Sequence, residues 1–183
     1  MRYVHGLQPQ MSPKDAVSIL ISSEFLQMAD LTEESLNFVA NNLQEILAQP
    51  IDMCCMGSAL VKRLAGKVEI EVLDSLFDKK DKLKSKIFMK KLEILFQNSQ
   101  NMLNRCAHCS TLFTEGQRKW QICEKASQIF VSAHGEMQAP HVIDRGFELN
   151  KFILYMREKK IPWRDLFWKL FSCLIEFTCT ECD

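Results

Sequence analysis

Two Cys-x-x-Cys pairs, Cys106/Cys109 and Cys179/Cys182, constrain this 183-residue chain more than any other feature of its sequence. Two residues between paired cysteines let a tight turn place both sulfur atoms about 2.3 Å from one zinc ion, which prefers four tetrahedral thiolate or imidazole ligands. The pairs therefore predict one structural zinc site with Cys106, Cys109, Cys179 and Cys182 as ligands. Because residues 110–178 separate the pairs, against about 15 to 20 residues in a compact ribbon, this segment must be a folded insert.

Two alternatives to the four-thiolate site remain open. A mixed site would use His108, His134 or His141 as a ligand, and a metal-free chain would hold only thiols or redox pairs. The other four cysteines have no adjacent histidine, and we expect them to be small buried hydrophobic residues: Cys54, Cys55, Cys123 and Cys173. Residues 1–6 lack the apolar core of a secretory signal, so we expect a cytosolic or nuclear environment, where disulfides are rare.

Charge and hydropathy exclude several classes of function. The 23 basic and 23 acidic residues cancel, so the chain has no general attraction to nucleic acid or anionic membranes. No stretch reaches the roughly 18 uninterrupted apolar residues of a membrane span. Seven lysines between positions 79 and 91 predict a solvated helix face; the alternative, a phosphate-contacting or partner-docking helix, lacks the interleaved arginine and aromatic residues that would support it. We therefore expect no membrane partner and no nucleic-acid binding through this region.

The first hundred residues predict helices. Ser12 and Pro13 begin the first, which runs to about Met28, and Thr32 caps the second. The expected helices cover residues 12–28, 32–47, 58–66 and 81–96. Residues 68–72 alternate between apolar and polar side chains, and strand and helix both remain open there.

The second half of the chain predicts a mixture of strands and helices. Strands are expected at 119–123 and 128–132, with a turn at His134-Gly135. Helices are expected near 147–159 and after Pro162, the last with a buried apolar stripe. The polar segment at residues 98–104 is the best candidate for a domain boundary.

One partial motif in the sequence is compatible with an enzyme, a zinc deaminase. His134 and Glu136, followed by the Cys179/Cys182 pair, have the outline of a zinc deaminase, in which His and two Cys hold zinc and Glu transfers protons. Deaminases place proline directly before the cysteine pair, and Thr178 stands there. The sequence has no glycine-rich phosphate loop and no Gly-x-Ser-x-Gly motif. We therefore expect that the chain is not an enzyme.

Several segments together resemble a known family. Residues 17–28 and 31–39 look like the paired C-terminal helices of a BTB (POZ) domain, in which a helix ending in Leu-Gln-Met precedes a second helix that runs into an aromatic residue. The lysine-rich segment 78–93, the two Cys-x-x-Cys pairs and the Trp-Arg-Asp sequence at 163–165 are similar to the SANT and BTB domain regulator of class switch recombination and its relatives. This resemblance covers nearly the whole chain.

The resemblance implies a fold and a function. We expect a mainly α chain: the C-terminal helices of a BTB-like fold over residues 1–66, a basic connecting helix over 67–100, and a small α+β zinc-bound module over 101–183. The match starts near the middle of a BTB domain, so we expect a fragment or short isoform. The implied function is a non-enzymatic protein-interaction module of a nuclear, or alternatively cytoplasmic, regulator of chromatin, transcription or DNA recombination. Homodimerisation and co-repressor binding are expected of the full-length form. The alternative is a BTB adaptor of a cullin ubiquitin ligase.

Overall fold

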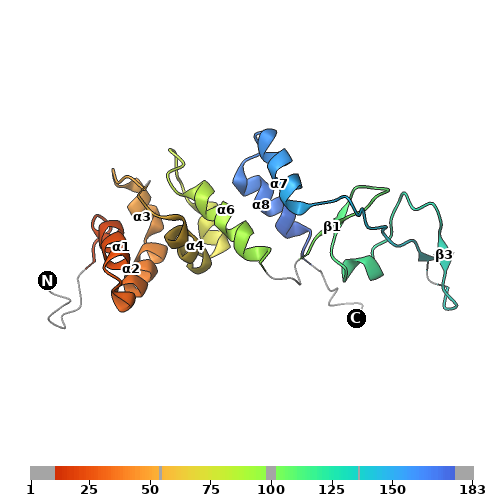
Figure 1. Cartoon of the computed structure of the whole chain (residues 1–183), viewed down its shortest axis with the longest axis horizontal. Helices are drawn as coiled ribbons and strands as arrows, with labels where there is room; N and C mark the ends of the chain where they lie inside the picture. The colour runs from red at the N-terminus through yellow and green to blue at the C-terminus, as the bar shows by residue number, and fades with distance from the viewer. Residues whose placement is uncertain (1–10, 54, 98–101, 136, 176–183) are drawn as a thin grey trace. The chain divides into compact units, whose positions relative to one another are not determined.

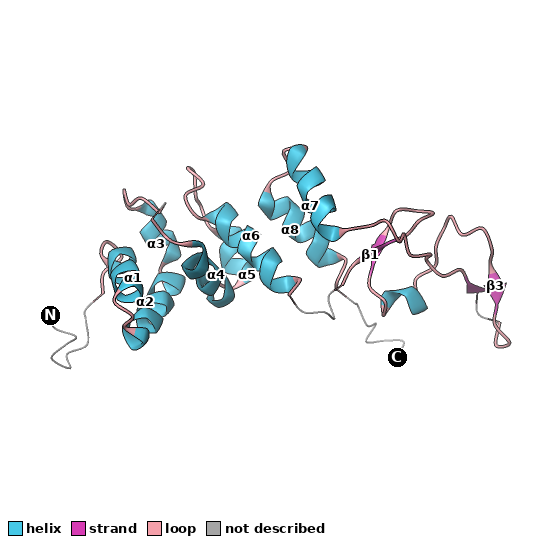
Figure 2. Cartoon of the chain, in the orientation of Figure 1, coloured by secondary structure: helices cyan, strands magenta, loops and turns pink. Residues whose placement is uncertain are grey.

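The computed structural model describes residues 11–53, 55–97, 102–135 and 137–175. The chain divides into two compact units, residues 1–94, here the helical unit, and residues 95–183, the second unit. Eight α-helices and two small sheets occur in the described part, so the expectation of a mainly α chain is confirmed (Figure 2). None of the helices in these ranges is both long and apolar enough to cross a lipid bilayer.

The helical unit is built on the packing of two helices. Helix α1 (Ala16–Phe25) lies against α2 (Ala29–Asn41), and α4 (Ser58–Lys67) also contacts α2 (Figure 1). The remaining helices are α3 (Leu43–Ala48), α5 (Ile70–Ser75) and α6 (Lys84–Leu95). Their apolar faces bury a leucine-rich core, and each fully buried side chain stabilises the fold by about 1.5–3 kcal/mol. The innermost residues are Leu20, Leu36, Leu43, Ile46, Leu64, Leu73, Leu83, Ile87 and Phe88.

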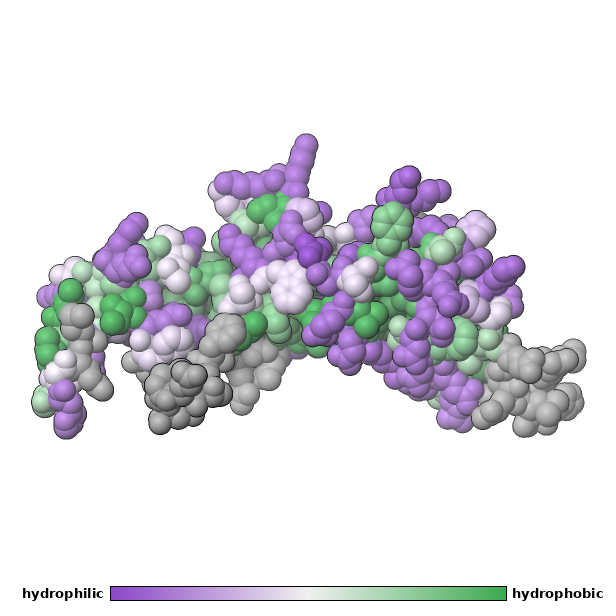
Figure 3. Space-filling model, turned by 180° about the vertical axis from the view of Figure 1, so that it is seen from behind, coloured by the Kyte–Doolittle hydropathy of each residue, from purple (hydrophilic) through white to green (hydrophobic). Residues whose placement is uncertain are grey.

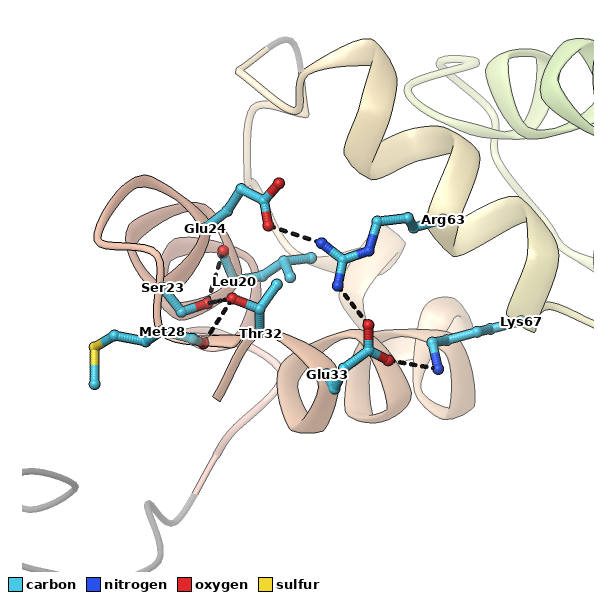
Figure 4. A network of polar contacts seen from close by, with 8 residues as sticks. All are labelled: Leu20, Ser23, Glu24, Met28, Thr32, Glu33, Arg63 and Lys67. Atoms are coloured by element: carbon cyan, nitrogen blue, oxygen red, sulfur yellow. Dashed lines mark hydrogen bonds and ion pairs between the residues drawn. The ribbon is translucent and has the colours of Figure 1, made fainter. Parts of the chain in front are cut away.

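Two local hydrogen bonds change the predicted helix boundaries. Thr32, expected as an N-cap, lies inside the first turn of α2, where its buried hydroxyl is 2.9 Å from the carbonyl oxygen of Met28 and 3.1 Å from the hydroxyl of Ser23 (Figure 4). The helix expected over 32–47 is interrupted at Asn42, whose side-chain amide donates to the carbonyl of Phe38 at 2.8 Å. Short polar side chains compete with the backbone for hydrogen bonds in this way. Residues 68–72, where the sequence is compatible with either strand or helix, lead into helix α5.

An ion-pair network connects α1, α2 and α4. Arg63 of α4 binds Glu24 of α1 at 2.8 Å and also Glu33 of α2, while Lys67 binds Glu33 at 2.9 Å (Figure 4). Hydrogen bonds from Lys67 and then from Arg63 lower the pKa of Glu33. Because these side chains are about one third to one half exposed, each pair is worth at most about 1 kcal/mol. The network therefore sets the orientation of α4 more than it adds stability.

Much of the lysine-rich segment is structural, so the prediction of a solvated face is wrong for three of its residues. The ammonium group of Lys82 donates to two carbonyl oxygens at the C-terminal end of α3, at 2.6 and 3.2 Å, and that of Lys84 donates to two at the end of α5, both at 2.8 Å. Lys90 is 8% exposed and pairs with Glu93 at 2.7 Å. Cations at helix C-termini satisfy free carbonyls and complement the helix dipole.

Asp78 fixes the beginning of α6. Its carboxylate accepts backbone N–H bonds from Lys82, Leu83 and Lys84 at 2.9–3.0 Å. Burial alone would raise the pKa of Asp78, but the backbone donors outweigh it and the pKa lies below its ordinary value. The ionised carboxylate therefore serves as the cap of the helix.

Replacing Asp78 is expected to weaken the helical unit in a pH-dependent way. The change Asp78→Asn removes the charge, and we expect a loss of about 1 kcal/mol in the free energy of unfolding at neutral pH. Since the folded pKa is lowered, the contribution of Asp78 is present above its unfolded pKa of about 3.9 and disappears as pH falls through the folded value. Urea unfolding followed by circular dichroism at neutral pH and at about pH 2.5 should show the gap to wild type narrowing in acid.

The matched control is Asp30→Asn, which alters an exposed carboxylate in the first turn of α2. Because this variant keeps the Asp78 cap, its free energy of unfolding should fall between neutral and acid pH in the same way as that of the wild type. A gap between Asp78→Asn and wild type that stays constant from neutral to acid pH would contradict the capping role.

The second unit combines two hairpins with two helices. Strand β1 (Asn104–Arg105) pairs antiparallel with β2 (Leu112–Phe113), and β3 (Phe130–Val131) with β4 (Met137–Gln138). Helices α7 (Leu149–Glu158) and α8 (Trp163–Ser172) follow, as the sequence predicts. The expected turn at His134-Gly135 is confirmed, with Gly135 at φ +84°. Figure 3 shows apolar and hydrophilic side chains together on the face that it draws. In the second unit, three consecutive large hydrophobic residues are exposed: Ile129, Phe130 and Val131.

The strand predicted at 119–123 is wrong. A short 3₁₀ helix, η3 (Gln117–Lys119), lies at its start instead. The side-chain carbonyl of Gln117 accepts the backbone N–H of Thr114 at 2.8 Å, and the Thr114 hydroxyl accepts the N–H of Gln117 at 3.2 Å. This reciprocal pair closes a turn that leads into η3. The N–H of Gln121 then donates to the carbonyl of Gln117 at 2.8 Å, so the backbone is turned where the strand was expected to begin.

Candidate metal centre

The first Cys-x-x-Cys pair lies in the turn of the β1–β2 hairpin. The N–H of Cys106 donates to the carbonyl of Thr111 at 2.9 Å, and the N–H of Ser110 donates back to the carbonyl of Cys106 at 3.0 Å. Ser110 has φ +64°, in the left-handed region, which closes the turn directly after Cys109. The hairpin therefore holds both sulfur atoms in one tight turn.

A second segment brings two further donors to this turn. Cys106 forms an antiparallel bridge with Ile143, and the N–H of Cys123 donates to the carbonyl of Ala139 at 2.7 Å. His141 lies between these two pairing points. Residues 139–143 thus align Cys123 and His141 with the hairpin through backbone hydrogen bonds.

Four donor atoms meet at this place. The sulfurs of Cys106, Cys109 and Cys123 and one ring nitrogen of His141 all lie within 4.8 Å of one another. The sulfurs of Cys106 and Cys123 are 3.7 Å apart, and the sulfur of Cys109 is 3.4 Å from Nδ1 of His141. A tetrahedral zinc site with ordinary bond lengths has edges of about 3.8 Å between sulfurs and about 3.6 Å between sulfur and nitrogen. These two separations are therefore compatible with a zinc site.

The cluster is shielded from water. Cys106, Cys123 and His141 are 1–3% exposed, and Cys109 is half-buried. The fully buried ring of Phe113 stacks on the imidazole of His141, with the ring centres 5.0 Å apart. An apolar surround of this kind excludes competing water and fixes the orientation of the imidazole ligand.

The electrostatics of the cluster favour a cation. Burial raises the pKa of Cys106, but the N–H of Cys109, the ring of His141 and two further backbone N–H groups outweigh it, so that pKa lies below its ordinary value. Burial and the neighbouring sulfurs raise the pKa of Cys123 instead. Adjacent buried thiols cannot all ionise alone, whereas a divalent ion stabilises every thiolate around it.

Two arginines support the ligand-bearing segment from outside. Arg118 donates through Nε to the backbone carbonyl of His141 at 3.1 Å. Arg105 forms an ion pair with Asp144, whose backbone N–H donates to the carbonyl of Arg105 at 2.8 Å. These contacts fix both the position and the direction of the segment that carries His141.

The structure places the predicted ligands only in part. Cys106 and Cys109 lie together in the cluster, whereas Cys179 and Cys182 fall outside the described residues, so the four-thiolate site remains a prediction. Of the histidines considered for a mixed site, His141 is in the cluster. His108 is exposed in the same turn as Cys106 and Cys109, His134 is exposed in the β3–β4 turn, and neither belongs to the donor group.

The remaining cysteines differ from one another. Cys123 is buried, as expected, but it is also a donor in the cluster, which the sequence analysis missed. Residues 110–122 separate Cys123 from Cys109, which is close to the spacing of a compact zinc ribbon. This spacing is the sequence signal that could have identified Cys123 as a ligand. Cys55 is exposed, so the expectation of a buried thiol is wrong there; Cys173 is half-buried, with its sulfur 3.1 Å from the carbonyl of Lys169. Cys54 lies outside the described residues.

The deaminase outline gains no support from the described residues. His134 lies in the exposed β3–β4 turn and belongs to no donor group found in the described ranges. Glu136, Cys179 and Cys182 fall outside those ranges.

Comparison with known proteins identifies a BTB-like region. The family model for the BTB domain of the SANT and BTB domain regulator of CSR matches residues 1–36. Within the described residues, this match covers α1 and the first part of α2. No solved structure matches the chain. BTB domains generally mediate protein–protein interaction, so the match points to an interaction module and leaves the metal centre outside the matched region.

Proposed function

We propose that the chain is a non-enzymatic protein-interaction module of a BTB-type regulator that acts in the nucleus on chromatin, transcription or DNA recombination. The BTB match at residues 1–36 carries this proposal. The resemblance of the lysine-rich segment and the cysteine pairs to the same regulator extends it along the chain.

The second unit, in this proposal, folds around one structural zinc ion held by Cys106, Cys109, Cys123 and His141. The supporting observations are that four donor atoms lie within 4.8 Å of one another, with two of the separations at 3.7 and 3.4 Å, and that three of the four residues are buried. All four coordination positions are then occupied by protein, and a closed site of this kind stabilises a fold rather than activating water. A site that pairs Cys106 and Cys109 with Cys179 and Cys182 is the alternative ligand set.

Partner identity tests the proposed function. The tagged full chain would be recovered from nuclear extract and its partners identified by mass spectrometry, beside the variant Leu36→Asp. Leu36 is completely buried in α2, so an aspartate there should unfold the helical unit, with the zinc content of the second unit unchanged.

We expect chromatin, transcription or recombination proteins to be enriched by the wild type and lost in Leu36→Asp. Enrichment of a cullin with other ubiquitin-ligase subunits would instead support the adaptor alternative. Recovery of the same partners by Leu36→Asp and wild type would contradict an interaction through the BTB-like region.

A further inference from the structure

The loop between α5 and α6 is rigidly anchored to α3. The side chain of Gln44 in α3 accepts the backbone N–H of Phe77 at 2.9 Å and donates to its carbonyl at 3.4 Å. On the other side of Phe77, the carboxylate of Asp78 accepts three backbone N–H bonds, and Lys82 donates to two carbonyls at the end of α3. The backbone on both sides of Phe77 is therefore held in one conformation.

This anchored loop presents an aromatic ring to solvent. Phe77 is 72% exposed although its backbone is fixed. It lines a cavity of about 370 Å³ together with the apolar residues Leu47, Ala48 and Pro50 and the basic residues Lys79 and Lys80. A rigid exposed aromatic residue next to a hollow loses little conformational entropy on binding, which is typical of interface hot spots.

The rim of the cavity is positively charged. Lys79 and Lys80 are exposed, and neither forms an ion pair within the described residues. The other charged groups of the lining are already engaged: Asp78 by backbone N–H donors and Lys82 by carbonyl oxygens. The charge left for a partner is therefore that of two lysines.

We propose that Phe77, Lys79, Lys80 and the adjacent cavity, here called the Phe77 site, bind an acidic segment of a partner protein. An apolar side chain of that segment enters the cavity against Phe77, and flanking aspartate or glutamate residues pair with the two lysines. The proposal rests on the interaction-module function and adds the class of partner. A nucleic-acid site would need several stacking rings along a basic track, whereas this one has a single ring and two lysines.

A synthetic peptide tests the site directly. The probe is a fluorescent twelve-residue peptide with a central leucine and glutamates on both sides, titrated with the full chain in the presence of zinc and followed by anisotropy. We expect saturable binding that weakens as salt rises. Replacing the glutamates with lysines, or the leucine with serine, should abolish binding. Phe77→Ala and the double variant Lys79→Glu/Lys80→Glu should each lower the affinity about tenfold.

The second unit offers a matched control. Tyr155 is an exposed aromatic residue with the ammonium of Lys159 4.4 Å from its ring centre, and Lys160 follows. Tyr155→Ala likewise removes an exposed aromatic ring, and Lys159→Glu/Lys160→Glu makes the same change in charge as the double test variant. We expect both to keep the affinity within about twofold of wild type, and circular dichroism to show all variants folded.

Several outcomes would overturn the Phe77 site. The first is the absence of saturable binding to the acidic peptide, and the second is an affinity for the lysine peptide equal to that for the acidic one. The third is a loss of affinity in the control variants equal to that in the test variants. The fourth is displacement of the bound peptide by single-stranded oligothymidine at a lower concentration than by unlabelled peptide. Nuclear partners that are lost in Leu36→Asp but fully retained in Phe77→Ala would overturn this site and leave the proposed function standing. Retention of all partners by Leu36→Asp would count against the proposed function itself.

Discussion

Removal of zinc is expected to unfold the second unit and to leave the helical unit folded. A structural zinc ion contributes about 10–16 kcal/mol in zinc-finger peptides, as much as the whole stability of many domains. Apart from the ligands, the buried core around the metal contains Phe113 and few other apolar residues. The core of the helical unit is instead built from leucine and isoleucine side chains and holds no donor cluster among its described residues.

The tryptophans report on the second unit alone. All three, Trp120, Trp163 and Trp168, belong to residues 95–183. Addition of a chelator should therefore change tryptophan fluorescence strongly, while most of the helical circular dichroism of α1 to α6 persists. Re-addition of zinc should restore the signal. A chelated chain with unchanged fluorescence would show that the second unit folds without metal.

Zinc stoichiometry in substituted chains identifies the ligands. We expect one zinc per chain in the wild type and loss of the metal in Cys106→Ser, Cys123→Ser and His141→Ala. The matched controls Cys179→Ser/Cys182→Ser and His134→Ala should keep it. The opposite pattern, with zinc kept in Cys123→Ser and lost in the Cys179/Cys182 variant, would establish the four-thiolate site. Removal of the last two residues gives a second test, because only the four-thiolate site would lose a ligand.

Truncation of Phe113 is expected to have the second-largest effect. The change Phe113→Ala removes a fully buried ring, which typically lowers the free energy of unfolding by about 3–5 kcal/mol. It also removes the surface on which the imidazole of His141 is stacked. Loss of such supporting contacts lowers metal affinity by about 10- to 100-fold. Phe113→Ala should therefore bind zinc more weakly although it keeps all four ligands.

Two measurements check this expectation. Competition with a chromophoric chelator gives the zinc affinity, and thermal unfolding followed by tryptophan fluorescence gives the stability of the second unit. The control Phe130→Ala removes a half-exposed ring from β3 and should change stability by no more than about 0.5 kcal/mol. Wild-type zinc affinity in Phe113→Ala would show that the stacked ring does not support the ligand.

Helices with strong apolar periodicity could be predicted from the sequence, and their ends could not. Residues 81–96 and the segment after Pro162 became α6 and α8 because each carries a regular apolar stripe and a defined start. Thr32 lies inside α2 and not at its cap, because its hydroxyl bonds the carbonyl of Met28 and also Ser23 of the preceding helix. The strand expected at 119–123 is replaced at its start by a turn that Gln117 closes with Thr114. The lysine-rich segment appeared solvated because the helix ends that bind its lysines lie outside it: Lys82 binds the end of α3, more than 30 residues earlier, and Lys84 binds the end of α5.

Two of the four donors in the candidate metal site, Cys106 and Cys109, could be predicted from the sequence. The two-residue spacing of Cys106 and Cys109 is a local signal, since one turn is sufficient to bring both sulfurs together. Cys123 and His141 join them only because residues 139–143 pair with two separate parts of the chain, and such tertiary pairing leaves no periodic pattern in the sequence.

The position of the ligands along the chain also determines where the second unit can tolerate change. Cys123 and His141 would bind the same ion, so the intervening residues 124–140, with the β3–β4 hairpin, form a loop closed at both ends by the metal. The entropic cost of closing a flexible loop rises by only about 0.6 kcal/mol for each doubling of the loop's length. The exposed turn at Gly135 can therefore accept an inserted sequence, such as a label or a recognition tag, while the four ligands stay in register.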